Sequence, residues 1–108
     1  MTDIPLPAPV QRAVEAANAG DTDAFLAVFG DDGAVDDWGR VFAGPEAIRG
    51  WSDREFIGKQ VTLAVTGSRT DGDTTTISTT VGGNGFNGPS DFAFTLDGQR
   101  VALMRITG

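Results

Sequence analysis

The 108-residue sequence contains no histidine, no cysteine and no tyrosine. Without histidine and cysteine, the chain cannot form a Ser-His-Asp triad, a thiolate nucleophile, a CxxC redox pair or a zinc site with nitrogen and sulfur ligands. Without tyrosine, it has no phenol that could donate a hydrogen bond to an oxyanion. Any proton transfer must therefore use Asp or Glu, or less favourably Lys59, and we expect no cofactor.

A basic patch and a long apolar run are also missing. Fifteen acids against eight bases give a net charge of −7, and the bases are scattered along the chain. This charge repels phosphate backbones and anionic membrane surfaces. No apolar run approaches the roughly 20 residues of a membrane span, and the N-terminus lacks the pattern of a signal peptide. We therefore expect a cytoplasmic protein whose partners include neither nucleic acid nor membrane.

Carboxylates, in contrast, are concentrated in one short stretch. Residues 31–39 read "DDGAVDDWG" and hold two pairs of adjacent aspartates. Their spacing differs from the D-x-[DN]-x-[DN]-G pattern of a calcium loop, so we expect no metal site. Asp31 and Asp32 are interpreted as residues of a helix end and a turn.

The first half of the chain shows helical periodicity. The length is that of one domain, residues 1–108, with residues 1–7 as a loose, proline-interrupted leader. Apolar residues recur at helical spacing in three segments that end at glycines. A proline fits the first turn of the first and third segments, and a capping residue starts the second. The expected helices are residues 9–19, a helix from a cap at Asp21 or Thr22 to Gly30, and residues 45–57.

From residue 60 onward the apolar period changes to two. Four strands are expected in "QVTLAVTG", "DTTTISTTV", "SDFAFTL" and "RVALMRIT", after a short strand at residues 34–38. Asn87-Gly88 is the strongest hairpin signal, and read as a two-residue turn it places Asn84 almost opposite Asp91. The pattern predicts helices followed by an antiparallel meander.

The last expected strand is apolar on both faces. Val101 and Leu103 form one set, and Ala102, Met104 and Ile106 form the other. A strand with one wet face would not show this pattern, so both faces should be covered. We predict a homodimer formed through the sheet face opposite the helices, with Val101 and Leu103 contributing.

Two motifs resemble a known family. "AGDTDAFLAVFGDDGAVDDWG" and "FAGPEAIRGW" are similar to the recurring motifs of small SnoaL-like members of the nuclear transport factor two-like superfamily. The order of expected elements matches that superfamily over the whole chain, and the motif match is sharp over residues 19–51. The resemblance implies a cone-shaped, cystatin-like α+β fold, with N-terminal helices packed on a curved antiparallel sheet, and a pocket for an apolar small molecule.

Within this superfamily, the stretch is most similar to the steroid Δ-isomerases, whose general base is an Asp that ends the first strand. The resemblance implies that Asp37 is the matching catalytic residue, acting on an apolar carbonyl-bearing substrate. Strand parity agrees, because Val35 and Asp37 share one face while Asp36 and Trp38 share the other. The alternative is a structural carboxylate bound to backbone amides or to Arg40.

The sequence also departs from these relatives. The isomerases polarise the substrate carbonyl with a tyrosine and a protonated aspartate, and the matching positions are approximately Ala13 and Phe92, which cannot donate. Polyketide cyclases usually pair their Asp with a His, which this chain lacks. An Asp-Arg-Asp relay like that of related epoxide hydrolases would need Asp37, Arg105 and Asp91, and strand parity disfavours it.

A cone fold leaves its open end unfilled, so a cavity is expected there. The candidate ligand-binding residues of its wall, which could equally be core, are Trp51, Phe92, Phe94 and Met104. Trp38 and Phe86 are expected near the cavity mouth or at an interface, and residues 52–55 on a solvated helix face. Three functions stay open: an isomerase- or cyclase-like enzyme, a non-catalytic binder of an apolar ligand, and a dimerisation module with a vestigial site.

Overall fold

The computed structural model describes residues 4–108, and residues 1–3 of the expected leader lie outside this range. Residues 4–7 have no regular structure, although Leu6 packs against the core. Three α-helices and one short 3-10 helix follow: α1 (Ala8–Ala19), α2 (Thr22–Val28), α3 (Pro45–Glu55) and η1 (Ile57–Lys59). As predicted, Asp21 caps α2, because its side chain accepts a hydrogen bond from the Ala24 amide at 3.0 Å.

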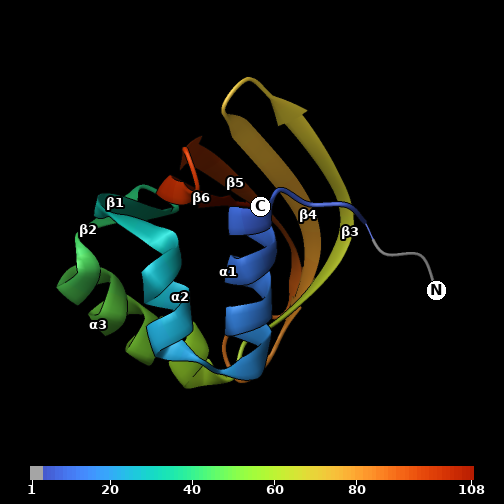
Figure 1. Ribbon diagram of the computed structural model, residues 1–108. Coiled ribbons are helices and arrows are strands. Elements are labelled where there is room, and N and C mark those ends of the chain that lie inside the picture. Colours follow the sequence, from blue (N-terminus) through green and yellow to red (C-terminus); the bar gives the residue numbers. More distant parts are fainter. Residues whose placement is uncertain (1–3) are drawn as a thin grey trace.

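Six strands form one sheet in the order β2-β1-β6-β5-β4-β3. Their bounds are β1 (Phe29–Asp37), β2 (Arg40–Ala43), β3 (Thr62–Asp71), β4 (Thr74–Gly82), β5 (Gly88–Asp97) and β6 (Arg100–Thr107). All neighbours are antiparallel except β1 and β6, which are parallel. The sheet curves around α1, and all three helices lie on its concave side (Figure 1). The predicted α+β class and cone-like architecture are confirmed.

The strand register places inward-facing side chains in two rows across the sheet. One row consists of Ile77, Phe92, Ile106, Asp37 and Arg40. The neighbouring row consists of Thr75, Phe94, Met104, Val35 and Phe42. Val35 is fully buried, so the predicted inward direction of the Val35 and Asp37 face is observed. Asp37 is thus the only acid in these two rows.

The start of β1 differs from the prediction. Helix α2 ends at Val28, because Phe29 already has an extended backbone with φ −81° and ψ 147°. Strand β1 therefore begins at Phe29, five residues earlier than expected. Asp31 and Asp32 are exposed residues in an irregular part of this strand rather than turn or helix-end residues. Periodicity cannot detect this, because the irregular pairing breaks the alternation of faces.

The predicted hairpin at Asn87-Gly88 is confirmed, because β4 and β5 pair antiparallel, but its reading as a two-residue turn is wrong. Strands β4 and β5 are joined by residues 83–87, which form a longer loop. The Asn87 side chain donates to the carbonyls of Gly83 at 2.9 Å and Gly85 at 3.2 Å, so it stabilises the loop from within. Asn84 lies in this loop, and Asp91 pairs with Ser78 instead.

The expected position of Val101 is also corrected. The register of β5 and β6 shifts between Leu103 and Val101, so that Ala102 is an extra residue in β6. Because this bulge reverses the alternation, Val101 points to the same side as Met104. Val101 is completely buried in the core and cannot contribute to an interface on the other face. Leu103 is half-buried and stays on the outer face.

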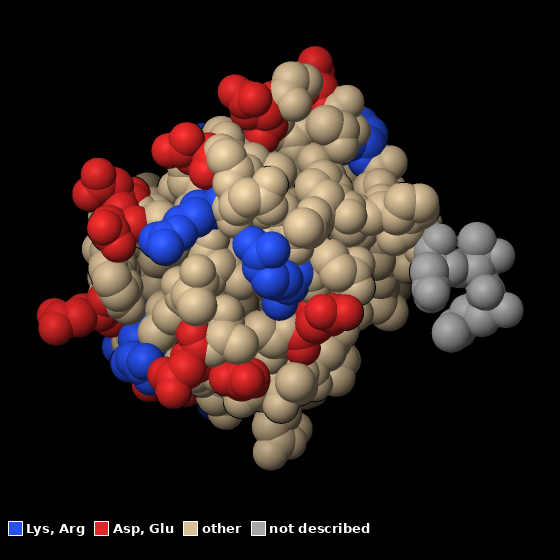
Figure 2. Space-filling view, viewed as in Figure 1, with Lys and Arg blue, Asp and Glu red and all other residues tan. Residues whose placement is uncertain are grey.

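The helix side of the molecule carries mixed charges. On the face drawn in Figure 2, basic side chains of the described residues are interspersed with acidic ones and form no continuous patch. None of the helices within residues 4–108 has the length and apolar character that a membrane crossing requires. Electrostatic attraction to a polyanion therefore has no support on this face.

Candidate functional site

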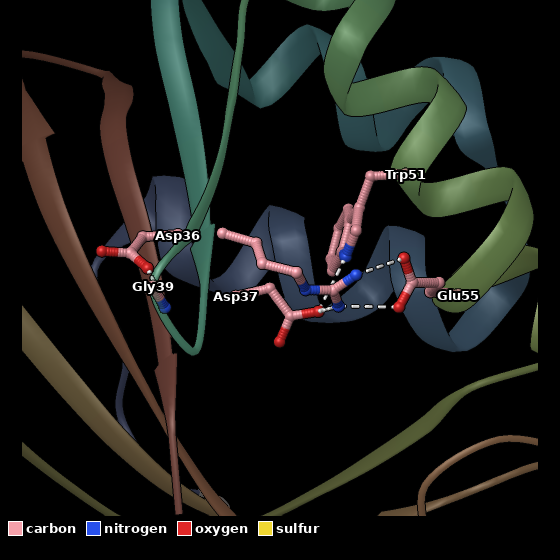
Figure 3. Close-up of polar contacts among 6 residues, drawn as sticks. Asp36, Asp37, Gly39, Trp51 and Glu55 are labelled. Atoms are coloured by element: carbon pink, nitrogen blue, oxygen red, sulfur yellow. Dashed lines mark hydrogen bonds and ion pairs between the residues drawn. The ribbon is translucent and has the colours of Figure 1, made fainter.

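Asp37 lies where the sheet meets the third helix. It ends β1 and pairs with Arg40, the first residue of β2, across a two-residue turn. Directly opposite residues of an antiparallel pair point to the same face, so Arg40 reaches Asp37 on the inner side. Asp37 Oδ2 accepts a hydrogen bond from Arg40 Nη2 at 2.6 Å and from Trp51 Nε1 at 3.0 Å (Figure 3). The sheet and α3 each supply one donor to this carboxylate.

Arg40 also binds a second carboxylate. Its Nη1 and Nη2 donate to Glu55 Oε2 and Oε1 at 3.0 Å and 2.7 Å, which is a bidentate contact. The hydrogen bond from Arg40 lowers the pKa of Glu55 below the ordinary value of 4.5. The same contact is the largest of the effects that raise the pKa of the Arg40 guanidinium. An acid–arginine–acid cluster therefore ties the β1–β2 hairpin to the end of α3.

The second oxygen of Asp37 is available. Within residues 4–108, both hydrogen bonds to this side chain reach Oδ2, and none reaches Oδ1. The side chain is 15% exposed, and no buried side-chain oxygen or nitrogen in the described part of the chain lacks a partner. Solvent must therefore reach Oδ1. Asp37 combines a fixed orientation with a free acceptor atom, which is the arrangement that a binding or proton-accepting group needs.

A cavity of about 340 Å³ opens beside Asp37. Its wall is mainly apolar and includes Trp51, Phe56, Phe92 and Ile106. Trp51 stacks on Phe56 with ring centres 4.8 Å apart, which holds the indole N–H toward Asp37. This volume lies at the low end of the range for ligand pockets, about 300–1,000 Å³. Apolar walls with one free carboxylate oxygen suit a small apolar molecule that carries one hydrogen-bond donor.

The predicted wall residues divide into two groups. Trp51 and Phe92 line the cavity together with Asp37. Phe94 and Met104 do not line it, because they are packed in the core with about 1% of their surface exposed. Both belong to the row of Val35, whereas Phe92 belongs to the row of Asp37. The cavity therefore lies beside the row of Asp37, whereas the side chains in the row of Val35 are packed in the core.

The other acids of the stretch do not join this cluster. Asp36 lies on the opposite face, where its side chain accepts from the Gly39 amide at 2.8 Å and from Arg105 Nε at 3.3 Å. Arg105 is thus directed away from Asp37, and the relay with Asp91 is not formed. In the described residues, no three Asp or Glu side chains lie close enough to hold a metal ion.

Three further charged residues, Arg54, Glu55 and Lys59, line the cavity. Arg54 and Lys59 were missed as wall residues, whereas Glu55 was expected either on the solvated face of residues 52–55 or on the inner stripe of the helix with Trp51. Ser52 of the same segment is completely buried. Neither Arg54 nor Lys59 forms an ion pair within residues 4–108. The spacing of Trp51 and Glu55, one turn apart on α3, was the available signal for Glu55.

Similar solved structures are found over almost the whole chain. A candidate polyketide cyclase from Sinorhizobium meliloti is 27% identical, with a TM-score of 0.83 and coverage of 94% of this chain and 95% of that one. A protein of ketosteroid isomerase-like fold from Catenulispora acidiphila, solved with trimethylamine, is 23% identical, with a TM-score of 0.82 and coverage of 96% and 87%. RV0760c from Mycobacterium tuberculosis, solved with estradiol-17β-hemisuccinate, is 17% identical, with a TM-score of 0.78 and coverage of 94% and 93%.

The family follows from the sequence match. No match to the chain was found among curated proteins. The model of the SnoaL-like domain, however, matches residues 10–107, which include every helix, strand and cavity residue described above except the first residues of α1. The resemblance predicted from the motifs is thereby confirmed. The chain belongs to the SnoaL-like family, with the nuclear transport factor two-like fold.

Proposed function

We propose that this protein binds a small, largely apolar molecule in the cavity and that Asp37 contacts the polar group of that molecule. The observation that carries the proposal is the free Oδ1 of Asp37 beside apolar walls, with Oδ2 held by Arg40 and Trp51. A carboxylate fixed in this way accepts a hydrogen bond from a ligand hydroxyl without losing further side-chain freedom. A fold neighbour solved with a steroid ester supports small-molecule binding by this architecture.

The test compares two ligands that differ by one hydroxyl group. Calorimetry should show that 2-naphthol binds the wild type more tightly than naphthalene does. In Asp37→Asn the preference should fall about tenfold, because a charge-assisted hydrogen bond contributes roughly 1.5–3 kcal/mol. Naphthalene affinity should stay unchanged, since the apolar walls are intact. A wild type that binds neither ligand would refute the proposal, and equal losses for both ligands in the variant would refute the role of Asp37.

Proton transfer is the second candidate function, and one specific observation favours it. Arg54 and Lys59 line the same cavity as Asp37, and each side chain carries a cationic N–H donor. They can supply the carbonyl polarisation for which the sequence offers neither tyrosine nor histidine. In an enone isomerisation, Asp37 Oδ1 would take the proton from the α-carbon of a β,γ-unsaturated ketone. The resulting dienolate oxygen would face these cations, and the Asp37 carboxyl would return the proton to the γ-carbon.

We retain the homodimer as a proposal, with Leu103 in place of Val101. Leu103 lies in an outer row of small or uncharged side chains with Thr74, Thr95, Ala34 and Ala43. Such a row on an open sheet face can pack against a second copy with little desolvation cost. Sedimentation at micromolar concentration should show a dimer for the wild type and a monomer for Leu103→Glu. A monomeric wild type would contradict the proposal.

A further inference from the structure

The turn between β1 and β2 has a tryptophan, Trp38, at a position with a positive φ. Trp38 and Gly39, its two central residues, have φ of 55° and 90°. Positive φ at both positions defines a type I′ turn, for which Asn-Gly is the preferred sequence. A tryptophan with positive φ is strained, because its Cβ approaches the backbone. The sequence therefore keeps Trp38 against the local preference of the turn.

Core packing does not explain this choice. The Trp38 side chain is 67% exposed, which makes it one of three large apolar side chains on the surface of residues 4–108. Its ring lies against Gly108, where an added Cβ would come within 2.6 Å of Cζ2 and Cη2. The indole thus contacts the residue after β6 without being buried. Backbone strain that core burial does not offset is typical of functional positions.

A second exposed aromatic ring lies on the same cavity wall. Phe86, in the loop after β4, is 59% exposed and lines the cavity together with Trp38. Its ring packs on Gly88, where an added Cβ would be 3.4 Å from Cζ. The third exposed apolar side chain, Val41, does not line the cavity. Within residues 4–108, two of the three large exposed apolar side chains therefore line the cavity, and they come from segments that are far apart in the sequence.

We propose that Trp38, together with Phe86, binds the part of a ligand that extends out of the cavity, so that this pair selects for ligands longer than the cavity itself. The inference rests on the proposed function, because it requires a ligand whose inner end occupies the cavity beside Asp37. The volume of about 340 Å³ supports it, since larger drug-sized ligands need more space than the wall encloses. The occupant is an elongated, ring-containing apolar molecule, and the aromatic faces contact its outer rings.

The test uses two phenols of different length, 2-naphthol and estradiol, with calorimetry on the wild type and Trp38→Asn. The substitution gives the turn its preferred Asn-Gly sequence, so the unfolding temperature should be equal to or higher than that of the wild type. Estradiol affinity should fall at least about tenfold through the lost apolar contact, and 2-naphthol affinity less than about threefold. Trp38→Phe should retain most of the estradiol affinity, and Val41→Asn, on the same hairpin, all of it.

Each other outcome contradicts the proposal in a recognisable way. A wild type that binds 2-naphthol but not estradiol would overturn the role of Trp38 while leaving the proposed function intact. The role of Trp38 would also be overturned if Trp38→Asn bound estradiol as tightly as the wild type, or if it lost affinity equally for both phenols. If Trp38→Asn converts a dimer into monomers at unchanged estradiol affinity, the indole belongs to an interface with a second copy. A wild type that binds neither phenol would overturn both proposals together.

Discussion

Replacing Asp37 with Asn should slow the conversion of 3-cyclohexenone to 2-cyclohexenone at least about 100-fold, the lower limit for loss of a positioned general base. The variant keeps nearly the same shape, and its amide oxygen can still accept from Arg40 and Trp51. It loses the proton acceptor at Oδ1, which no other group within residues 4–108 replaces on the same row of the sheet. The ultraviolet absorbance of the conjugated product measures the rate.

Asp36→Asn is the matched control for this experiment. Asp36 is the adjacent carboxylate, lies on the opposite face and binds Gly39 and Arg105. Its replacement should leave the isomerisation rate within about twofold of the wild type, because surface substitutions outside the site change little. If Asp37→Asn isomerises the ketone at the wild-type rate, Asp37 is not the base. If the wild type itself does not exceed the buffer reaction, the catalytic candidate fails and ligand binding remains.

Gly58→Ala should lower the free energy of unfolding by about 3 kcal/mol or more, because overpacking without room to relax is among the most destabilising changes. A Cβ at Gly58 would collide with the backbone carbonyl of Asp53, and would lie 2.5 Å from its carbon. A backbone atom within α3 cannot move away as a flexible side chain would. The loss should also displace η1, which carries the wall residue Lys59, and so weaken 2-naphthol binding.

Urea denaturation of Gly58→Ala and Gly67→Ala measures this effect. Gly67 lies in β3, has no heavy atom within 4 Å of an added Cβ and needs no positive φ. Gly67→Ala should therefore change the free energy of unfolding by no more than about 0.5 kcal/mol. If the two variants are equally stable, the close approach of η1 to the end of α3 does not exist in solution.

The sequence by itself determined which kinds of catalytic and metal site the chain cannot form, and it determined most of the fold. Missing residue types excluded histidine- and cysteine-dependent sites, because a chain cannot supply absent side chains. Periodicity and caps predicted the three helices, since capping and amphipathicity are local. Parity within β1 predicted that Val35 and Asp37 share the inner face, because alternation is a property of a single regular strand. The motifs of residues 19–51 predicted the SnoaL-like family.

Tertiary structure decided the neighbours of Asp37 and the extent of the cavity. Arg40 reaches Asp37 through hairpin register, whereas Glu55 and Trp51 reach the cluster only because α3 packs across the end of the sheet. The bulge in β6 turned Val101 into the core, and core packing filled the space around Phe94 and Met104. Arg40 is three residues from Asp37 and was a partner that the sequence offered, but the other outcomes depend on strand pairing and helix docking between residues farther apart in the chain. Local sequence patterns do not determine which strands and helices come together, because the same alternation of apolar residues is compatible with several strand registers.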